Sequence, residues 1–450
     1  MDITFFGASH QVTGSCYLVS TKKKNILFDC GMFQGSDFNE GRNHDAFSFD
    51  PKQIDTVLVS HAHTDHTGRI PKLIKDGFAG KLYMTKGTLA LSRIVWEDAY
   101  HIMVYNNRKF QSPILFTPDD IVRACENTIP VDYGTTLDLG GGISAVFKDA
   151  GHIFGSSFIE VFDGDTTVAY SGDVGNVDVP ILRNTAQLGN VDVLLCESTY
   201  GDREHESRKD REKIFVDLIQ EGVRRGGTIM MPAFSLERTQ EILYVLNEMF
   251  DNHPTLPKIP IFLDSPMAIK AIDVYKRYPE YYDAEAAKKY SLGEDFFSFP
   301  NLTCTLSRDE SKRINSIKGP KLIIAGSGMM NGGRILHHAK RYLSDKRSML
   351  VIVGYQAQNT LGRRLYEGAR EVTIHNEKIP VHAKVTAIGA LSAHADKKQL
   401  IRWVSEAVSK PKTVFCVHGE AVPATSLAHS LRDRLGISAY VPEEGEQVSI

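Results

Sequence analysis

The sequence predicts an α/β protein in which one α/β domain is inserted into another, and three changes along the chain support this fold class. Short strand patterns separated by Gly and Asp turns fill roughly the first 200 residues. From about Arg208, helical patterns alternate with buried apolar strands, and after about residue 380 the strand patterns return. Alternating strands and helices are typical of a parallel sheet covered on both faces. Two consecutive domains are the alternative.

The first part of the chain contains mainly strands by its pattern of apolar and turn residues. The strands expected there are Asp2–Phe6, Ser15–Val19, Asn25–Asp29, Thr56–Ser60, Ile143–Lys148, Ser157–Phe162, Thr166–Ser171 and Val191–Cys196, and the clearest helices are Ile70–Asp76 and Thr88–Asn106.

The same patterns of apolar and turn residues predict the helices and strands in the middle and last parts of the chain. The middle part is expected to contain helices at Lys209–Arg225, Glu237–Asn252, Ala268–Arg277 and Asn331–Leu343, and strands at Thr228–Met231, Ile259–Leu263 and Lys321–Ala325. Strand patterns in the last part are Val385–Ile388 and Thr413–Val417.

Composition indicates a folded globular protein. Hydrophobic residues make up 42% and charged residues 24% of the 450 residues, and no apolar run approaches the roughly 20 residues that span a bilayer. The net charge of -3 gives no overall basic field of the kind common in nucleic-acid binders, although it leaves a local basic groove open. Six cysteines stand far apart, and the N-terminus lacks a signal-peptide pattern. A cytoplasmic protein with reduced thiols and no membrane attachment is expected.

The strongest chemical signal is His61-Ala-His63-Thr-Asp65-His66, directly after the apolar run Thr-Val-Leu-Val-Ser. Side chains alternate along a strand, so His61 and His63 are expected to point the same way. Asp65 and His66 follow at the turn into a helix. A lone His is usually a core or surface residue, whereas four potential ligands within six residues suit a site for two metals.

Three further candidates stand at strand ends beside glycine, namely Asp29, His152 and Asp173. Glycine lets the backbone turn sharply and approach a metal closely. Each candidate is weak alone, because an Asp in a Gly-rich turn is usually only a turn residue. Asp29 is placed to support a metal ligand through a hydrogen bond and not to bind the metal itself.

In chain order, these residues resemble the four opening motifs of the metallo-β-lactamase fold. The resemblance covers roughly the first 200 residues and implies an αββα sandwich with a metal pair at one edge of the sheets. The ligands it implies, with Asp173 as the bridge, are His61, His63 and His152 for one metal and Asp65 and His66 for the other.

Three later segments resemble the additional motifs of the β-CASP nucleases, the group of the messenger-RNA 3′-end cleavage factor and ribonuclease J. They are Cys196-Glu197-Ser-Thr-Tyr-Gly, Leu391-Ser-Ala-His394-Ala-Asp and Val417-His418-Gly-Glu. The resemblance implies that Glu197 and His394 pair beside the scissile phosphate and that His418 completes the second metal. Further matches at 233–240, 264–268, 326–334 and 354–356 extend it over nearly the entire chain.

The same resemblance implies the domain boundaries. Residues 1–204 would form the first part of a metallo-β-lactamase domain, residues 205–380 an inserted β-CASP domain and residues 381–450 the final part of the first domain. His418 follows His61 by more than 350 residues, so a shared site requires the chain to return. This requirement disfavours two consecutive domains.

The function implied is a metal-dependent ribonuclease that cuts internally, with cutting from an end left open. Two Zn²⁺ ions are expected, and Mn²⁺ is the alternative for a His and Asp ligand set. A hydroxide bridging the metals would attack phosphorus and leave 5′-phosphate and 3′-hydroxyl ends. Asp65 and Glu197 are counted with the catalytic residues, and His394 is the candidate to protonate the leaving 3′ oxygen.

Single-stranded RNA is the expected substrate, in a groove between the two domains. Candidate RNA contacts in the β-CASP part are Ser327, Gly328, Met329 and Arg334 at a Gly-rich turn, with Arg238, Arg363 and Arg364 for the phosphate backbone. An ordinary strand–helix turn and solvated arginines are the alternatives. Without an evident appended RNA-binding domain, a homodimer or RNA-processing partner proteins are open.

Other functions compete with this one. The first alternative is a small-molecule ester or thioester hydrolase, which would use the same metal site. The second is a DNA nuclease, which would need similar chemistry. The last is an inactive scaffold protein, which would have lost metal ligands. The long insert and the Glu197–His394 pair argue against the first alternative. The presence of every expected ligand argues against the last.

Overall fold

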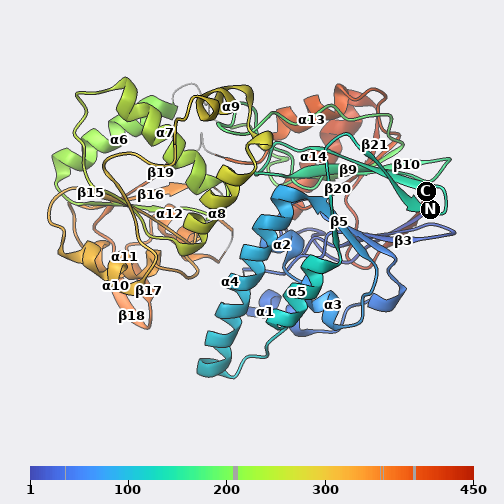
Figure 1. Ribbon diagram of the computed structural model, residues 1–450, viewed down its shortest axis with the longest axis horizontal. Helices are drawn as coiled ribbons and strands as arrows, with labels where there is room; N and C mark the ends of the chain where they lie inside the picture. Colours follow the sequence, from blue (N-terminus) through green and yellow to red (C-terminus); the bar gives the residue numbers. More distant parts are fainter. Residues whose placement is uncertain (36, 206–210, 355, 358, 389–391) are drawn as a thin grey trace. The chain divides into compact units, whose positions relative to one another are not determined.

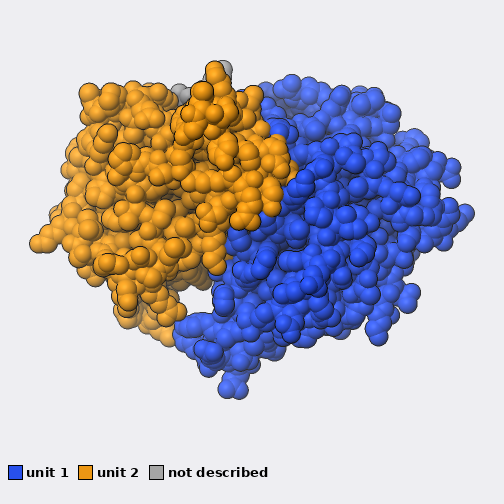
Figure 2. Space-filling view, in the orientation of Figure 1, with its two compact units in different colours: residues 1–204, 394–450 blue, residues 205–393 orange. Residues whose placement is uncertain are grey.

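The structure is a computed structural model (Figure 1), and it describes residues 1–450 except 36, 206–210, 355, 358 and 389–391. The chain forms two compact units, one made of residues 1–204 and 394–450 (unit 1) and the other of residues 205–393 (unit 2), as Figure 2 shows. Unit 2 therefore interrupts unit 1 in the sequence. The described helices include none with both the length and the apolar composition that a membrane crossing requires.

Unit 1 contains two seven-stranded sheets. The strands of the first sheet, in spatial order, are β22 (Gln447–Ser449), β1 (Asp2–Phe5), β2 (Tyr17–Ser20), β3 (Asn25–Phe28), β4 (Thr56–Leu58), β5 (Lys81–Thr85) and β6 (Thr128–Val131). Those of the second sheet are β21 (Ser438–Tyr440), β20 (Thr413–Val417), β11 (Val193–Glu197), β10 (Thr167–Tyr170), β9 (Ser157–Phe162), β8 (Ile143–Asp149) and β7 (Thr136–Gly140).

The two sheets of unit 1 pack face to face, with helices on both outer sides. Alternation along β2 explains the layering, because Tyr17 points into the core between the sheets while Leu18 points toward the outer helices. The helices of unit 1 are α1 (Asp37–Gly41), α2 (Thr64–Thr67), α3 (Ile70–Lys75), α4 (Lys86–Phe110), α5 (Pro118–Glu126), α13 (Lys397–Ser405) and α14 (Ala421–Leu435). The αββα arrangement implied by the resemblance is confirmed.

The outer helices of unit 1 cover different sheets. Residues Ile70 of α3 and Trp96 of α4 pack with Leu27 of the first sheet. On the second sheet, α13 and α14 lie beside β20 (Figure 1), and Val404 of α13 and Leu427 of α14 belong to the buried cluster of that side. Burial of these apolar faces is the main source of stability, at about 25 cal/mol per Å² of apolar surface.

Unit 2 is a six-stranded sheet whose strands all run parallel. In spatial order they are β14 (Leu302–Cys304), β13 (Ile261–Leu263), β15 (Lys321–Ala325), β12 (Thr228–Pro232), β16 (Met349–Val353) and β19 (Lys384–Ile388). The central strands β12, β15 and β16 are buried at every position, as expected for a parallel sheet covered on both faces. This confirms the α/β nature of the insert.

Helices and one hairpin complete unit 2. They are α6 (Arg211–Arg225), α7 (Arg238–Asn252), α8 (Pro266–Arg277), α9 (Ala284–Ser291), α10 (Arg308–Arg313), α11 (Ile335–Tyr342), α12 (Leu361–Tyr366) and the hairpin β17 (Glu371–Ile374) and β18 (Glu377–Pro380). Residues 209 and 210 of the expected helix Lys209–Arg225 lie outside the described residues.

The return of the chain to unit 1 differs from the expected boundary. The sequence places it at residue 381, together with the strand Val385–Ile388. In the structure that strand is part of β19, which pairs in parallel with β16 at the edge of the unit 2 sheet, from Met349↔Lys384 to Val353↔Ile388. Unit 1 therefore resumes at His394.

Candidate metal centre

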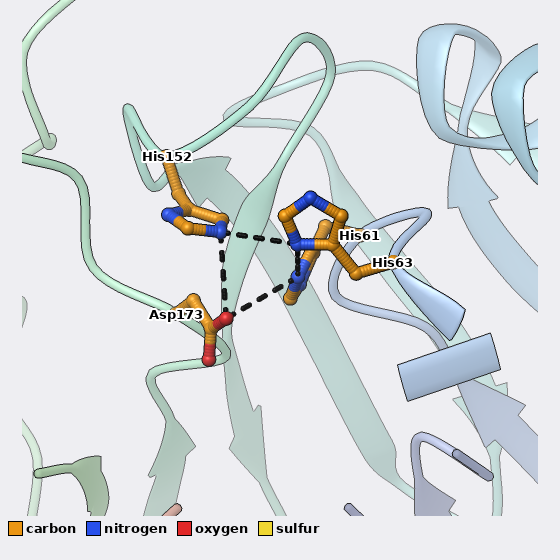
Figure 3. A group of neighbouring side chains, drawn as sticks. All are labelled: His61, His63, His152 and Asp173. Atoms are coloured by element: carbon orange, nitrogen blue, oxygen red, sulfur yellow. Dashed lines mark hydrogen bonds and ion pairs between the residues drawn. The ribbon is translucent and has the colours of Figure 1, made fainter. Parts of the chain in front are cut away.

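The motif 61–66 lies just beyond β4, in the short connection to α2 and α3. His61 follows the buried residues Val59 and Ser60, and His63 is the residue preceding the first turn of α2. The Nε2 atom of His61 lies 3.1 Å from Nδ1 of His63, so both rings point into one space (Figure 3). Asp65 and His66 then lie within α2.

A first donor group consists of His61, His63, His152 and Asp173 (Figure 3). Nε2 of His152 is 3.3 Å from Nδ1 of His63. The Oδ2 atom of Asp173 is 3.4 Å from Nε2 of His61 and 3.4 Å from Nε2 of His152. Three imidazole nitrogens and one carboxylate oxygen thus converge from three separate chain segments.

A second donor group consists of Asp65, His66 and His418. It lies beside the first, because Oδ1 of Asp173 is 3.3 Å from Nε2 of His66 and 3.5 Å from Nε2 of His418. The Oδ2 atom of Asp65 is 3.9 Å from Nε2 of His418. Asp173 therefore presents one carboxylate oxygen to each group.

The chemistry of both groups fits a pair of cations. His66 Nε2 and Asp173 Oδ1 are buried and make no hydrogen bond within the described part of the chain. Burial lowers the pKa of His61 and His152 well below the ordinary value and that of His418 to about 4, which favours the neutral imidazole that binds metals. Imidazole and carboxylate donors without thiolates suit zinc or manganese.

The carboxylate that bridges the groups stays ionised. Burial alone would raise the pKa of Asp173, but the rings of His418 and His66 hold it well below its usual range. Burial likewise opposes protonation of His66, yet Asp173 and Asp29 hold its pKa well above the ordinary value. A bound cation would replace the proton that these charges favour on His66.

Asp29 supports the site from behind, as the sequence suggests. Its carboxylate is fully buried and accepts hydrogen bonds from Ser60 N at 2.7 Å, Ser60 Oγ at 2.6 Å and Tyr170 OH at 2.8 Å. It also lies 2.7 Å from Nδ1 of His66. Because the Ser60 hydroxyl donates to Asp29, it can accept from Nδ1 of His61 at 3.0 Å.

Two of these supporting residues, Ser60 and Tyr170, are not among the site residues expected from the sequence. Ser60 could have been found, because it directly precedes His61 at the end of the apolar run. Tyr170 carries no comparable signal, since it reaches Asp29 only through the packing of segments 141 residues apart.

Glu197 and His394 form a pair beside the bridging carboxylate. Glu197, at the end of β11, is fully buried, and its Oε1 accepts from Val174 N at 2.8 Å and faces Nδ1 of His394 at 3.1 Å. Nδ1 of His394 is 3.9 Å from Oδ2 of Asp173. Burial lowers the pKa of His394, but Glu197 and Asp173 outweigh this effect and raise it to about 9. The His394 side chain is 17% exposed, so a substrate can reach it.

The candidate RNA contacts all lie in unit 2. Ser327, Gly328 and Met329 follow β15, and α11 begins only at Ile335. Gly328 lies against the ring of Phe234, where a Cβ would be 2.6 Å from a ring carbon. The turn uses some of its own backbone groups, since Met330 N donates to Ser327 O at 3.1 Å.

The arginine candidates differ in how they are placed. Arg334 donates to Asp264 Oδ1 at 2.7 Å and to two backbone carbonyls, and Arg238 is buried beside Glu241. Arg363 pairs with Glu367 at 2.6 Å near the surface, and Arg364 is exposed. The guanidinium groups of Arg363 and Arg364 are therefore the more accessible ones.

Comparison with protein-family models gives three matches. The model of the metallo-beta-lactamase superfamily matches residues 11–200, that of the Beta-Casp domain residues 239–365, and that of a Zn-dependent metallo-hydrolase RNA specificity domain residues 378–442.

Whole-length relatives are also found. The chain is 39% identical to Ribonuclease TTHA0252 of Thermus thermophilus over 100% of both chains. It is 32% identical to an RNase J-like protein of Methanocaldococcus jannaschii, covering 98% of each, and 31% identical to Transcription termination factor FttA of the same organism, covering 98% of this chain and 70% of that protein. A solved structure of a protein of unknown function from Enterococcus faecalis V583 shares the fold, with a TM-score of 0.55 at 14% identity over 100% of this chain and 99% of that chain.

Proposed function

We propose, on the premise that this chain belongs to the β-CASP family of metallo-β-lactamase-fold ribonucleases and is a metal-dependent hydrolase, that it hydrolyses phosphodiester bonds of single-stranded RNA and leaves 5′-phosphate and 3′-hydroxyl ends. The relative of the same length is named a ribonuclease, which supports RNA as the substrate class.

One observation carries the proposal. The carboxylate of Asp173 shares its two oxygens between two adjacent groups of imidazoles, and the Glu197–His394 pair lies beside the same carboxylate. Hydrolysis of a phosphodiester needs an activated water, positive charge near the phosphate and an acid for the leaving oxygen. The described residues supply donors for the first two needs and a protonated imidazole for the third.

The metal-holding residues divide between two positions. The first would use Nε2 of His61, Nδ1 of His63, Nε2 of His152 and Oδ2 of Asp173, and the second Asp65, His66, His418 and Oδ1 of Asp173. When bound, two Zn²⁺ or Mn²⁺ ions would lower the pKa of water and offset negative charge on the phosphate.

His394 is the proposed general acid. Nδ1 of its ring faces Glu197, which fixes the ring and leaves Nε2 to donate a proton. Glu197 is itself held by backbone donors, Val174 N at 2.8 Å and Thr199 N at 3.2 Å, so the pair is pre-organised. In the reaction the oxygen of water bonds to phosphorus while that water loses a proton to solvent, the bond from phosphorus to the 3′ oxygen breaks, and the Nε2 proton of His394 moves to that oxygen. A proton from solvent then restores the His394 ring.

RNA binding outside the centre is proposed for the exposed part of unit 2. Arg363 and Arg364, in the last turn of α12, are suited to contact phosphates because their guanidinium groups lie near the surface. Ser327, Gly328 and Met329 stay candidates through their backbone. Arg334 and Arg238 hold carboxylates inside unit 2, so RNA contact by them would require these pairs to open.

Cleavage of a 5′-labelled single-stranded RNA by zinc-loaded protein tests the proposal. A double variant, Asp65→Ala with His66→Ala, serves as the matched control. Fragments with 3′-hydroxyl ends, formed by the wild type alone and abolished by a chelator, are expected. Products ending in 2′,3′-cyclic phosphate would contradict the proposed attack by water. If single-stranded DNA were cut equally well, the substrate class would be single-stranded nucleic acid and not RNA alone.

A further inference from the structure

Ser15 is a buried residue between β1 and β2. It contacts two members of the second donor group, His418 and Asp65. Its Oγ lies 2.9 Å from Nδ1 of His418. Its backbone N–H donates to the carbonyl of Asp65 at 2.9 Å. Ser15 is fully buried, and 403 residues separate it from His418 in the sequence.

The contact with His418 determines how that ring is presented. Nε2 of His418 faces Asp173 and Asp65, at the second metal position. With Nε2 bound to a cation there, the neutral ring would carry its proton on Nδ1, which lies within hydrogen-bond distance of Ser15 Oγ and can donate to it. A ligand histidine usually fixes its tautomer through such a bond from the other ring nitrogen. The backbone is held as well, since His418 N donates to Ala8 O at 2.8 Å.

Close packing holds Ser15 at this place. Gly31 N donates to Ser15 O at 2.9 Å, and a Cβ on Gly31 would lie 1.5 Å from the carbonyl oxygen of Asp65. Gly14 has φ +80°, and a Cβ there would lie 2.4 Å from the Phe33 ring. The two glycines thus let three backbone segments meet tightly, which leaves Ser15 little freedom to move away from His418.

We propose that Ser15 is a positioning residue for the second metal position: it fixes His418 with Nε2 presented to the metal and anchors the segment that carries Asp65. The inference rests on the metal-dependent function proposed above. The first position has its own hydroxyl, because Ser60 Oγ faces Nδ1 of His61 at 3.0 Å. Each donor group therefore has one serine behind one of its histidines.

Because Ser15 contacts a histidine of the second donor group and Ser60 one of the first, Ser15→Ala should affect metal binding at the second position only. The variant leaves the Nδ1–H of His418 without an acceptor, and the loss of such a supporting group typically weakens metal binding by about 10- to 100-fold. In a competition titration of metal-free protein with Zn²⁺ against a chromophoric chelator, one of the two binding steps is expected to weaken by that factor and the other to stay unchanged. Ser15→Thr, which keeps the hydroxyl, is expected to recover most of the affinity.

Ser9→Ala is the matched control, because Ser9 lies in the same segment and is buried, and its Oγ makes no hydrogen bond with any described residue. It should bind two Zn²⁺ as the wild type does. His418→Ala marks the affinity expected when the ligand itself is missing. Two binding steps of wild-type strength in Ser15→Ala would overturn the proposal, and so would equal weakening in Ser9→Ala.

If Ser15→Ala does not fold by circular dichroism, the zinc-loaded wild type answers the question. Nitrogen-15 shifts of the His418 ring are expected to show a protonated, hydrogen-bonded Nδ1, and an unprotonated Nδ1 would overturn the proposal. These readouts involve no RNA. A protein that binds two metals in the predicted way and cuts no RNA would therefore refute the proposed function and leave the role of Ser15 standing.

Discussion

At the scale of single residues, Asp29 illustrates that much of this centre depends on groups behind the donors. Its carboxylate takes hydrogen bonds from Ser60 and Tyr170 and faces Nδ1 of His66. Asp29→Asn keeps the size of the side chain but replaces one carboxylate oxygen by an amide NH₂ group, which cannot accept a hydrogen bond. We expect zinc affinity to fall by about 10- to 100-fold, measured by competition with a chelator. Asp309→Asn, an exposed carboxylate in unit 2, should leave zinc affinity unchanged.

His394 gives a prediction of a different kind, because it is proposed to act on substrate and not to hold metal. His394→Ala should retain two metals per chain, measured by atomic emission, and reduce RNA turnover by about 10² or more. Full turnover in this variant would remove His394 from the mechanism. Loss of metal would instead place it in the donor groups.

The pH dependence follows from the raised pKa of His394, which Glu197 and Asp173 bring to about 9 against the effect of burial. A general acid acts in its protonated form, so turnover should fall as the pH rises through this pKa. Cations bound to the neighbouring donors would lower the pKa, because they disfavour a charged ring. The alkaline limb of the rate profile is therefore expected at or below about pH 9, and it should be absent in His394→Ala.

The seven metal-donor candidates could be nominated from the spacing at 61–66, from the glycine-flanked His152 and Asp173 and, for His418, from the resemblance to the β-CASP nucleases. The structure places them in two adjacent groups, and their binding of metal stays a prediction. The hydroxyls behind them could not be nominated in this way. A serine or tyrosine has no distinctive spacing, and Ser15 meets His418 only because strands from the two ends of the chain join one unit.

At the scale of elements, Asp264 ties several parts of unit 2 together. This buried carboxylate follows β13 and accepts from Thr305 after β14 at 2.6 Å and from Ser311 of α10 at 2.6 Å. It also accepts from Arg334 at 2.7 Å and lies 2.7 Å from Nε2 of His338 in α11. Asp264→Ala leaves these groups without their acceptor. We expect the free energy of unfolding of unit 2 to fall by about 3 kcal/mol in urea titrations.

The contribution of Asp264 should depend on pH. Burial raises its pKa, but hydrogen bonds from His338, Ser311, Thr305 and Arg334 outweigh burial and hold it well below the usual range. A depressed carboxyl pKa contributes its full stabilisation of the folded state above the unfolded value of about 4. This contribution is lost progressively as the pH falls from that value through the lower pKa of the folded state. The stability difference between wild type and Asp264→Ala should therefore be constant near neutrality and narrow in acid. A difference independent of pH down to about pH 3 would contradict this account.

Long, regular elements were the predictable ones. The expected helix Glu237–Asn252 corresponds to α7, Arg238–Asn252, and the strand Lys321–Ala325 coincides with β15. The strand β16 was missed although it is a continuous apolar run, since a short run of this kind does not distinguish a strand from a buried helix. The strand at 385–388 was found, but its partner β16 could not be read from local sequence.

At the scale of the whole molecule, unit 1 depends on both ends of the chain. β20 pairs in parallel with β11, with Cys416 opposite Cys196, and β22 pairs with β1. Lys397 N donates to Arg203 O at 3.1 Å, so the two points where the chain leaves and re-enters unit 1 are neighbours. The insertion could be inferred from sequence because widely separated ligands needed one site.

This closeness predicts that unit 1 can exist alone. A variant that joins Glu204 to His394 through a short Gly-Ser linker and omits unit 2 should fold and bind two zinc ions. RNA cleavage by it should be much weaker, because the proposed phosphate contacts are absent. Circular dichroism, metal analysis and RNA cleavage measure the three outcomes. A chain that stops at residue 204, which lacks unit 2 and also β20, β21 and β22, is the matched control and should not fold cooperatively.

The return of the chain at His394 also sets an order of events on the ribosome. At about 5–20 residues per second, synthesis of the 189 residues from 205 to 393 takes roughly 10–40 s. During that interval the nascent unit 1 has the motif 61–66 but lacks β20, His394 and His418, whereas unit 2 emerges whole. The second donor group and the proposed proton donor can therefore be completed only after the whole of unit 2 has been synthesised.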